Sequence, residues 1–254
     1  MINEPIEGQY TEPFTRPTRS RMWEVLKYFY RVSISLRARF PFPLIPALFT
    51  EKERMLNDAI AFAQFNKVRG DYLEFGTFEG NAFLVAYHLG QSYRLKDMHF
   101  YAFDSFEGLP EVKGIDVLSD SEPYYKKGEL SCSLDRFRKI IRRHGVDMSK
   151  THIVPGFFEK TLNEKTKESL PLRSAAVVLI DCDLYASTRT VLDFLTDYLV
   201  NGSVILFDDW FNYRGDPRLG EHRAFREWLE QHPELQASQY RPFAWHGNSF
   251  IIHR

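Results

Sequence analysis

The stretch AAVVLIDCDLYAST, residues 175–188, decides the fold because it joins an uninterrupted apolar run to two acids and the start of a helix. Runs that are apolar on both faces are typical of strands inside a parallel sheet. Similar short runs, separated by stretches of helical periodicity, are DYLEF at 71–75, HFYAF at 99–103, THIV at 151–154 and GSVILF at 202–207. This alternation predicts an α/β fold in which a mostly parallel sheet is buried between helix layers.

Helices are expected between these strands and before the first of them. Thr50 and Glu53 form a capping-box pattern, which predicts a helix over about 51–66. Further helical patterns cover 20–40, the segment after Gly80, 134–145, 187–199 and 220–233, while 235–247 and 248–254 are expected to form a closing antiparallel pair. We expect residues 67–254 to form one domain. Residues 1–66 are expected to form a partly helical extension, which covers the acceptor side or contacts another copy.

Composition excludes several classes of protein. The formal net charge of the 254 residues is -1, which excludes a strongly basic protein that binds nucleic acid through its phosphates. Two cysteines, Cys132 and Cys182, are too few for a disulfide framework and favour a reducing compartment. The first residues lack a basic segment followed by an apolar one, and no window offers about 18 uninterrupted apolar residues. We therefore expect a cytoplasmic protein without a membrane span.

Acidic residues close the apolar runs. They are Glu74, Asp104, Asp181 and Asp208. In an open α/β sheet the ligand crevice lies beyond the carboxyl ends of the strands, so these four side chains are expected at one edge. One such acid is usually a helix cap, but four together repel one another unless a cation or a donor-rich ligand lies among them.

The segment EFGTFEGNA, residues 74–82, predicts a tight glycine turn into a helix. The dinucleotide pattern G-x-G-x-x-G is absent, and Glu74 occupies ground that would face a pyrophosphate. A cofactor that carries an ammonium and a sulfonium fits this charge better. Asp104, 24 residues after Gly80, suits the paired hydroxyls of a cofactor ribose. The alternative is a purely structural turn.

A second pair of acids follows the next apolar run. Asp208 and Asp209 lie in ILFDDWF, 27 and 28 residues after Asp181. Three oxygen ligands from two adjacent strand ends would suit Mg²⁺, with waters or a substrate oxygen completing six. The alternative is a solvated turn or a helix-capping pair.

Several of these motifs resemble, in order and spacing, the macrocin O-methyltransferase family, whose members methylate sugar hydroxyls in natural-product biosynthesis. The resemblance spans roughly residues 70–210, and its motifs are YLEFGTFEGNA, YAFDSFEGLPE, VPGFFEKTL, LIDCDLYASTRTVLDFL and GSVILFDDW. It implies a Rossmann-like class I methyltransferase fold with S-adenosylmethionine as the cofactor. The sheet would have seven strands, the last pair antiparallel.

The resemblance also implies roles for individual residues. The loop residues Glu74, Gly76, Thr77, Phe78, Glu79 and Gly80 would wrap the methionine part of the cofactor. Asp104, Ser105 and Phe106 would hold the ribose and flank the adenine, and Gly156, Phe157 and Phe158 would lie along the adenine. Asp181, Asp208 and Asp209 would ligate Mg²⁺, with Asp183 as the alternate for Asp181.

The reaction implied is methyl transfer to a sugar hydroxyl of a small-molecule acceptor. Asp181 and Asp183 are the nearest candidates for the general base, and His222 and His246 are outside candidates. Two other functions stay open: a glycosyltransferase that uses Asp181-Cys182-Asp183 as a D-x-D motif, and a binding module without turnover. Residues 111–133 are expected to form either a lid or an exposed insertion. The apolar N-terminal region is compatible with a homo-oligomer.

Overall fold

The computed structural model describes residues 21–37, 50–117 and 125–254. Parts of the expected N-terminal extension and of the 111–133 loop lie outside these ranges. The strands are β1 Asp71–Phe75, β2 Phe100–Asp104, β3 Thr151–Pro155, β4 Ala175–Ile180, β5 Leu199–Phe207, β6 Gln236–Gln239 and β7 Asn248–His253. The helices are α1 Arg21–Arg37, α2 Glu51–Phe65, α3 Asn81–Ser92, α4 Leu134–Arg143, α5 Phe158–Thr161, α6 Glu164–Ser169, α7 Tyr185–Leu195 and α8 Gly220–Gln231.

The strands form one seven-stranded sheet of order β3-β2-β1-β4-β5-β7-β6. β1 to β5 are parallel, and β7 pairs antiparallel with both β5 and β6. The chain moves outward from β1 through β2 to β3 and then returns to the other side of β1 to begin β4. The crevice at this reversal, beyond the carboxyl ends of β1 and β4, is where ligands bind in such sheets.

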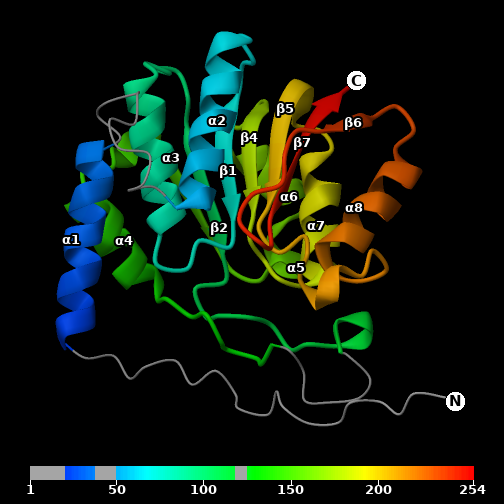
Figure 1. Cartoon of the computed structure of the whole chain (residues 1–254), viewed down its shortest axis with the longest axis horizontal. Helices are drawn as coiled ribbons and strands as arrows, with labels where there is room; N and C mark the ends of the chain where they lie inside the picture. Colours follow the sequence, from blue (N-terminus) through cyan, green and yellow to red (C-terminus); the bar gives the residue numbers. More distant parts are fainter. Residues whose placement is uncertain (1–20, 38–49, 118–124) are drawn as a thin grey trace, which may run out of the picture.

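Two helix layers bury the sheet, as the apolar runs predicted. Figure 1 shows α1 to α4 on one side of the sheet and α5 to α8 on the other. Side chains alternate between the layers: Tyr72 packs in the cluster that contains α2, α3 and α4, and Leu73 packs in the cluster that contains α7 and α8. All six residues of β4 are buried. Burying a side chain such as Leu or Phe stabilises the fold by about 1.5–3 kcal/mol.

The predicted fold class and most predicted elements are confirmed. Thr50 and Glu53 form both bonds of the capping box at the start of α2. The closing antiparallel pair forms as β6 and β7, but β6 covers only 236–239 of the predicted segment 235–247. Among the described residues, no helix combines the length and the apolar character that crossing a bilayer demands.

One predicted helix boundary is wrong. The pattern over 187–199 predicted one helix, but α7 begins at Tyr185 and ends at Leu195, and Leu199 begins β5. The backbone explains the difference, because the Ala175 N–H donates to the carbonyl of Tyr198 and thereby joins this segment to the sheet. The short helices α5 and α6 were not predicted, since four and six residues are too few to show helical periodicity.

Candidate functional site

The glycine turn after β1 lies against the end of β4. Gly76 has a φ of +87°, and a Cβ at this position would be 1.8 Å from the carbonyl oxygen of Asp181. The Gly76 N–H donates to Phe103, and the Asp181 N–H donates to Phe75. Only glycine allows the chain to pass this close, so Gly76 fixes the turn at the crevice between β1 and β4.

Asp104 holds this turn from the end of β2. One carboxylate oxygen accepts the backbone N–H groups of Thr77 and Phe78, at 2.7 and 3.0 Å. The other oxygen accepts the backbone N–H of Phe106 at 2.7 Å. Asp104 therefore orders two loops around the cavity that it borders.

That cavity has a volume of about 270 Å³ and is lined by many of the residues predicted to bind the cofactor. Phe157 and Phe158, with Leu109, Pro110 and Leu130, give it an apolar side, and Asp104 and Ser105 give it a polar side. Such a surface suits a ring system joined to a hydroxylated sugar. Its remaining lining residues are Lys52, Gly76, Phe78, Gly108, Glu159, Asp181, Cys182, Asp183 and Ser187.

Other residues predicted to bind the cofactor lie elsewhere. Glu74 and Thr77 border a second cavity of about 590 Å³, and so does Glu79, which is paired with cations of α1 and α4. Glu74 is buried and accepts a hydrogen bond from the Tyr72 hydroxyl at 2.5 Å. Gly80, Phe106 and Gly156 line neither cavity. A Cβ on Gly80 would strike Phe137, so this glycine serves the packing of α4.

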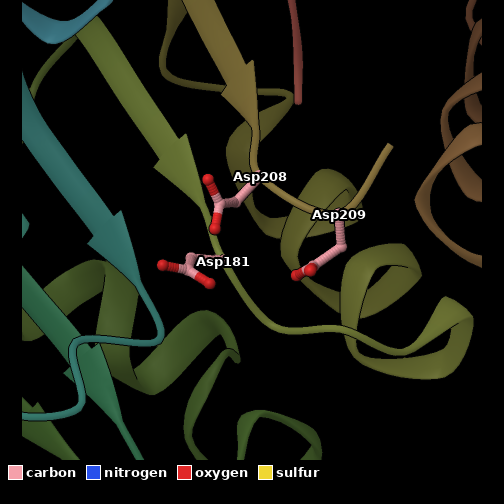
Figure 2. Close-up of side chains that lie close together, drawn as sticks. All are labelled: Asp181, Asp208 and Asp209. Carbon is pink, nitrogen blue, oxygen red and sulfur yellow. The ribbon is translucent and has the colours of Figure 1, made fainter. Parts of the chain in front are cut away.

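Asp181, Asp208 and Asp209 lie together where β4 and β5 end. One carboxylate oxygen from each lies within 4.8 Å of the others, and Figure 2 shows Asp209 turned toward the facing pair of Asp181 and Asp208. Asp183 does not belong to this group. It has a φ of +63°, is buried and lines the smaller cavity. The D-x-D pattern therefore does not place both of its acids in one set of ligands.

Buried polar side chains surround Asp209. Its carboxylate accepts the Asn212 amide at 2.6 Å and the Asp183 backbone N–H at 3.2 Å. Its own N–H donates to Glu221 at 2.8 Å. Neither Asn212 nor Glu221 was predicted from the sequence as a residue of the site. Glu221 is fully buried although it is an acid in the first turn of an amphipathic helix, where a solvated side chain is the ordinary expectation.

Burial and mutual repulsion disfavour the charged forms of these acids. Burial, followed by the charge of Asp181, raises the pKa of Asp183 to about 7 and that of Asp208 to about 6. Burial also raises the pKa of Asp209 and of Glu221 well above the usual range. Burial alone would lower the pKa of Lys52, but the charges of Asp181 and Asp208 raise it. The site thus contains more carboxyl groups than the single ammonium of Lys52 could neutralise if all of them were ionised.

The donor set fits a divalent cation. Oδ1 of Asp208 and Oε1 of Glu221 are buried and find no hydrogen-bond partner among the described residues. Buried acceptors of this kind are costly unless a donor or an ion satisfies them. Three carboxylates within reach of one point, all of them oxygen ligands, match the preference of Mg²⁺.

The two candidate histidines differ in position. His246 lines the larger cavity, and its Nδ1 lies 2.5 Å from the carbonyl oxygen of Asp208. His222 stacks on Trp210, with ring centroids 4.3 Å apart, and lines neither cavity. The structure therefore brings His246, and not His222, to the rim of the site.

The described parts of the 111–133 loop contact the site. Asp116 accepts the backbone N–H groups of Tyr185 and Ala186 and so caps α7, which follows the DCD segment. The Tyr125 hydroxyl accepts the amide of Asn212 at 2.8 Å, and Leu130 lines the smaller cavity. Tyr124 lies outside the described residues. These contacts attach both ends of the loop to the site.

Comparisons with known proteins identify the family and the fold of this chain. The model of the family described as Macrocin-O-methyltransferase (TylF) matches residues 41–232. Mycinamicin III 3''-O-methyltransferase of Micromonospora griseorubida is 28% identical over 159 residues, which are 61% of this chain and 61% of the relative. The 8-demethyl-8-(2,3-dimethoxy-alpha-L-rhamnosyl)-tetracenomycin-C 4'-O-methyltransferase of Streptomyces olivaceus is 29% identical over 56% of this chain and 54% of its own length. The alignments thus span less than two thirds of these relatives.

The fold is also found in a solved structure. The O-methyltransferase NovP superposes with a TM-score of 0.66 at 20% identity, over 80% of each chain. At this identity the likeness concerns the fold. The family model, in contrast, covers most of the sequence, including the glycine turn and all three aspartates of the carboxylate group. This chain therefore belongs to the macrocin O-methyltransferase family.

Proposed function

We propose that this protein transfers a methyl group from S-adenosylmethionine to a sugar hydroxyl of a glycosylated natural product, with Mg²⁺ held by Asp181, Asp208 and Asp209. The observation that carries the proposal is the group of three carboxylates beside a cavity whose apolar and polar sides are complementary to adenosine. Both relatives named above are O-methyltransferases, and the name of the second describes a substrate that carries a rhamnosyl group. The family of this chain supports the same reaction.

The smaller cavity would bind the methyl donor, and the larger cavity would bind the acceptor. Asp104 and Ser105 would bind the ribose hydroxyls of the methyl donor, and Phe157 and Phe158 would contact its adenine. The larger cavity, which shares Lys52, Phe78 and Asp181 with the smaller one, would receive the acceptor. Its exposed Trp245 offers the flat apolar face on which sugars commonly stack. The acceptor oxygen and the donor methyl would then meet beside Asp181.

The residues at this junction would orient the hydroxyl and take its proton. A bound Mg²⁺ would supply Lewis-acid polarisation of the acceptor oxygen. Methyl transfer would form the new O–CH₃ bond and break the S–CH₃ bond of the donor, and the hydroxyl proton would pass to a carboxylate of this site. Asp181 and Asp183 both border the smaller cavity and are the candidates for this carboxylate.

A coupled assay tests this proposal. The protein is incubated with S-adenosylmethionine and a panel of glycosides, and S-adenosylhomocysteine is measured with Mg²⁺, with EDTA and after Mg²⁺ is restored. We expect EDTA to abolish turnover and Mg²⁺ to restore it. Loss of a metal contribution of several kcal/mol would make Asp208→Asn at least about 100-fold slower.

Asp216→Asn is the matched control for that variant. Asp216 follows the same strand but lines neither cavity and pairs with Arg218 at the surface. Its replacement should leave turnover within about twofold. Calorimetric binding of UDP-glucose in place of S-adenosylmethionine would instead support the glycosyltransferase. Tight binding of S-adenosylmethionine without turnover on any glycoside would support the non-catalytic module.

A further inference from the structure

Lys52 contacts two members of the three-carboxylate group. It lies in the first turn of α2, and its Nζ is 2.8 Å from Oδ2 of Asp181 and 2.5 Å from Oδ2 of Asp208. The capping box of Thr50 and Glu53 fixes the start of this helix. The backbone of Lys52 is thus anchored, and only its side chain is able to leave the carboxylates.

The ammonium of Lys52 occupies the position that a metal ion bound by both Asp181 and Asp208 would need. A Mg²⁺ ion bound by the same oxygens would lie about 2.0–2.1 Å from each of them. An ammonium at its present distance from those oxygens would then lie within a few ångströms of a doubly charged ion in a largely buried site. Such a repulsion between cations is weakly screened. Both cations neutralise the same two charges, so either one makes the other less favourable.

We propose that Lys52 is an internal competitor for the metal site, whose ammonium neutralises Asp181 and Asp208 until a divalent cation displaces it. The inference rests on the proposed function, because it assumes the metal. The larger cavity, which Lys52 also lines, gives the displaced side chain a place to go. Lys52 therefore weakens metal binding and keeps the metal-free protein folded.

An alternative arrangement makes the opposite prediction. Oδ1 of Asp208 has no hydrogen-bond partner among the described residues, so a metal bound through it would let Lys52 stay on Oδ2. Lys52 would then orient the ligand, and its removal would weaken metal binding or leave it unchanged. The sign of the change in affinity decides between the two arrangements.

The test measures Mn²⁺ binding by electron paramagnetic resonance, without cofactor or acceptor. Lys52→Met removes the charge and keeps much of the side-chain length, and Lys52→Arg keeps the charge. We expect Lys52→Met to bind Mn²⁺ at least tenfold more tightly than the wild type, and Lys52→Arg to stay within about threefold of it. In EDTA, Lys52→Met should melt at a lower temperature than the wild type, and Mn²⁺ should raise its melting temperature by more.

Lys27→Met is the matched control. The Lys27 side chain is 29% exposed, against 27% for Lys52, and it also pairs with a buried acid, but that acid is Glu79, outside the carboxylate group. The Lys27→Met variant should bind Mn²⁺ with the same affinity as the wild type. Equal or weaker binding by Lys52→Met overturns the inference and leaves the proposed metal standing. If neither the wild type nor Lys52→Met binds Mn²⁺, both the inference and the proposed metal site are overturned. Binding as expected, without methyl transfer, contradicts the proposed reaction and supports the role of Lys52.

Discussion

Gly76 shows how one residue links the glycine turn to the carboxylate group. The glycine pattern predicted a tight turn, but the sequence does not reveal that the end of β4 passes against it. The reason is that Gly76 and Asp181 are far apart in the chain and meet only through the pairing of β1 with β4. Residue spacing predicted the turn, whereas its contact depends on tertiary structure.

We expect Gly76→Ala to destabilise the protein strongly and to abolish binding of S-adenosylmethionine. Its Cβ would meet the Asp181 carbonyl at 1.8 Å, in addition to the cost of a positive φ. Gly145→Ala is the control, since Gly145 has a φ of +84° but an added Cβ would meet no described atom within 4 Å beyond its chain neighbours. The free energy of unfolding of the control should fall by only about 1–2 kcal/mol, which is the cost of a left-handed backbone for a residue with a Cβ. Denaturant unfolding and calorimetry measure both variants, and equal losses of stability would refute the clash.

The acids of the site were easier to predict than their partners. Asp181, Asp208 and Asp209 follow apolar runs, so parallel pairing alone brings them to one edge. Lys52 gave no such signal, because a lysine in the first turn of a helix usually belongs to a solvated face. Its contact with Asp181 spans 129 residues of sequence.

At the scale of elements, α1 is anchored through a buried acid of the glycine turn. The carboxylate of Glu79 accepts hydrogen bonds from Lys27 and Arg31 of α1, at 2.8 and 2.9 Å. It also accepts one from Arg136 of α4, at 3.1 Å. The side chains of Glu79 and Arg31 are 1% and 5% exposed. Helical periodicity predicted α1, but nothing in the sequence pairs its cations with this acid. The anchor couples the N-terminal helix to the turn that borders both cavities.

Glu79→Gln should therefore destabilise the protein by about 3 kcal/mol, because it removes the negative charge with which the buried guanidinium of Arg31 is paired. Glu24→Gln is the control. Glu24 also pairs with Arg136, but its side chain is 41% exposed, so its loss should cost less than about 1 kcal/mol. Urea unfolding at pH 7 measures both. Similar small effects would show that α1 is held by apolar contacts instead.

The pH dependence of this difference has a definite sign. Burial acts to raise the pKa of Glu79, but the hydrogen bond from Lys27 and the charges of Lys27, Arg31 and Arg136 lower it overall. The stabilisation is then complete above the unfolded pKa of about 4.3 and is lost as the pH falls through the lower folded value. The gap between wild type and Glu79→Gln should shrink as the pH is lowered from 5 to 3.

At the scale of the whole molecule, the strand order places the site. The reversal between β1 and β4 opens the crevice, and the glycine turn, Asp104 and the carboxylate group all lie at the carboxyl ends of the strands around it. Apolar runs and their alternation with helices predicted this sheet, because each run has to be buried on both faces. They did not predict where Lys52 and Glu221 meet it, since these contacts depend on how the helices pack on the sheet.

A fold built around the ligands of this crevice should be stabilised when they bind. A ligand at about 100 times its dissociation constant, if it binds only the folded state, adds about 2.7 kcal/mol. For a chain of this size that corresponds to a rise in melting temperature of about 5–10 °C. We expect S-adenosylmethionine to give such a rise, and Mg²⁺ to add to it. Asp208→Asn should keep the rise due to S-adenosylmethionine and lose the part due to Mg²⁺, because Asp208 belongs to the carboxylate group and does not line the smaller cavity. If the variant loses both parts together, the two ligands do not occupy the separate positions that we propose for them, and the carboxylate group is instead part of the binding surface for the methyl donor.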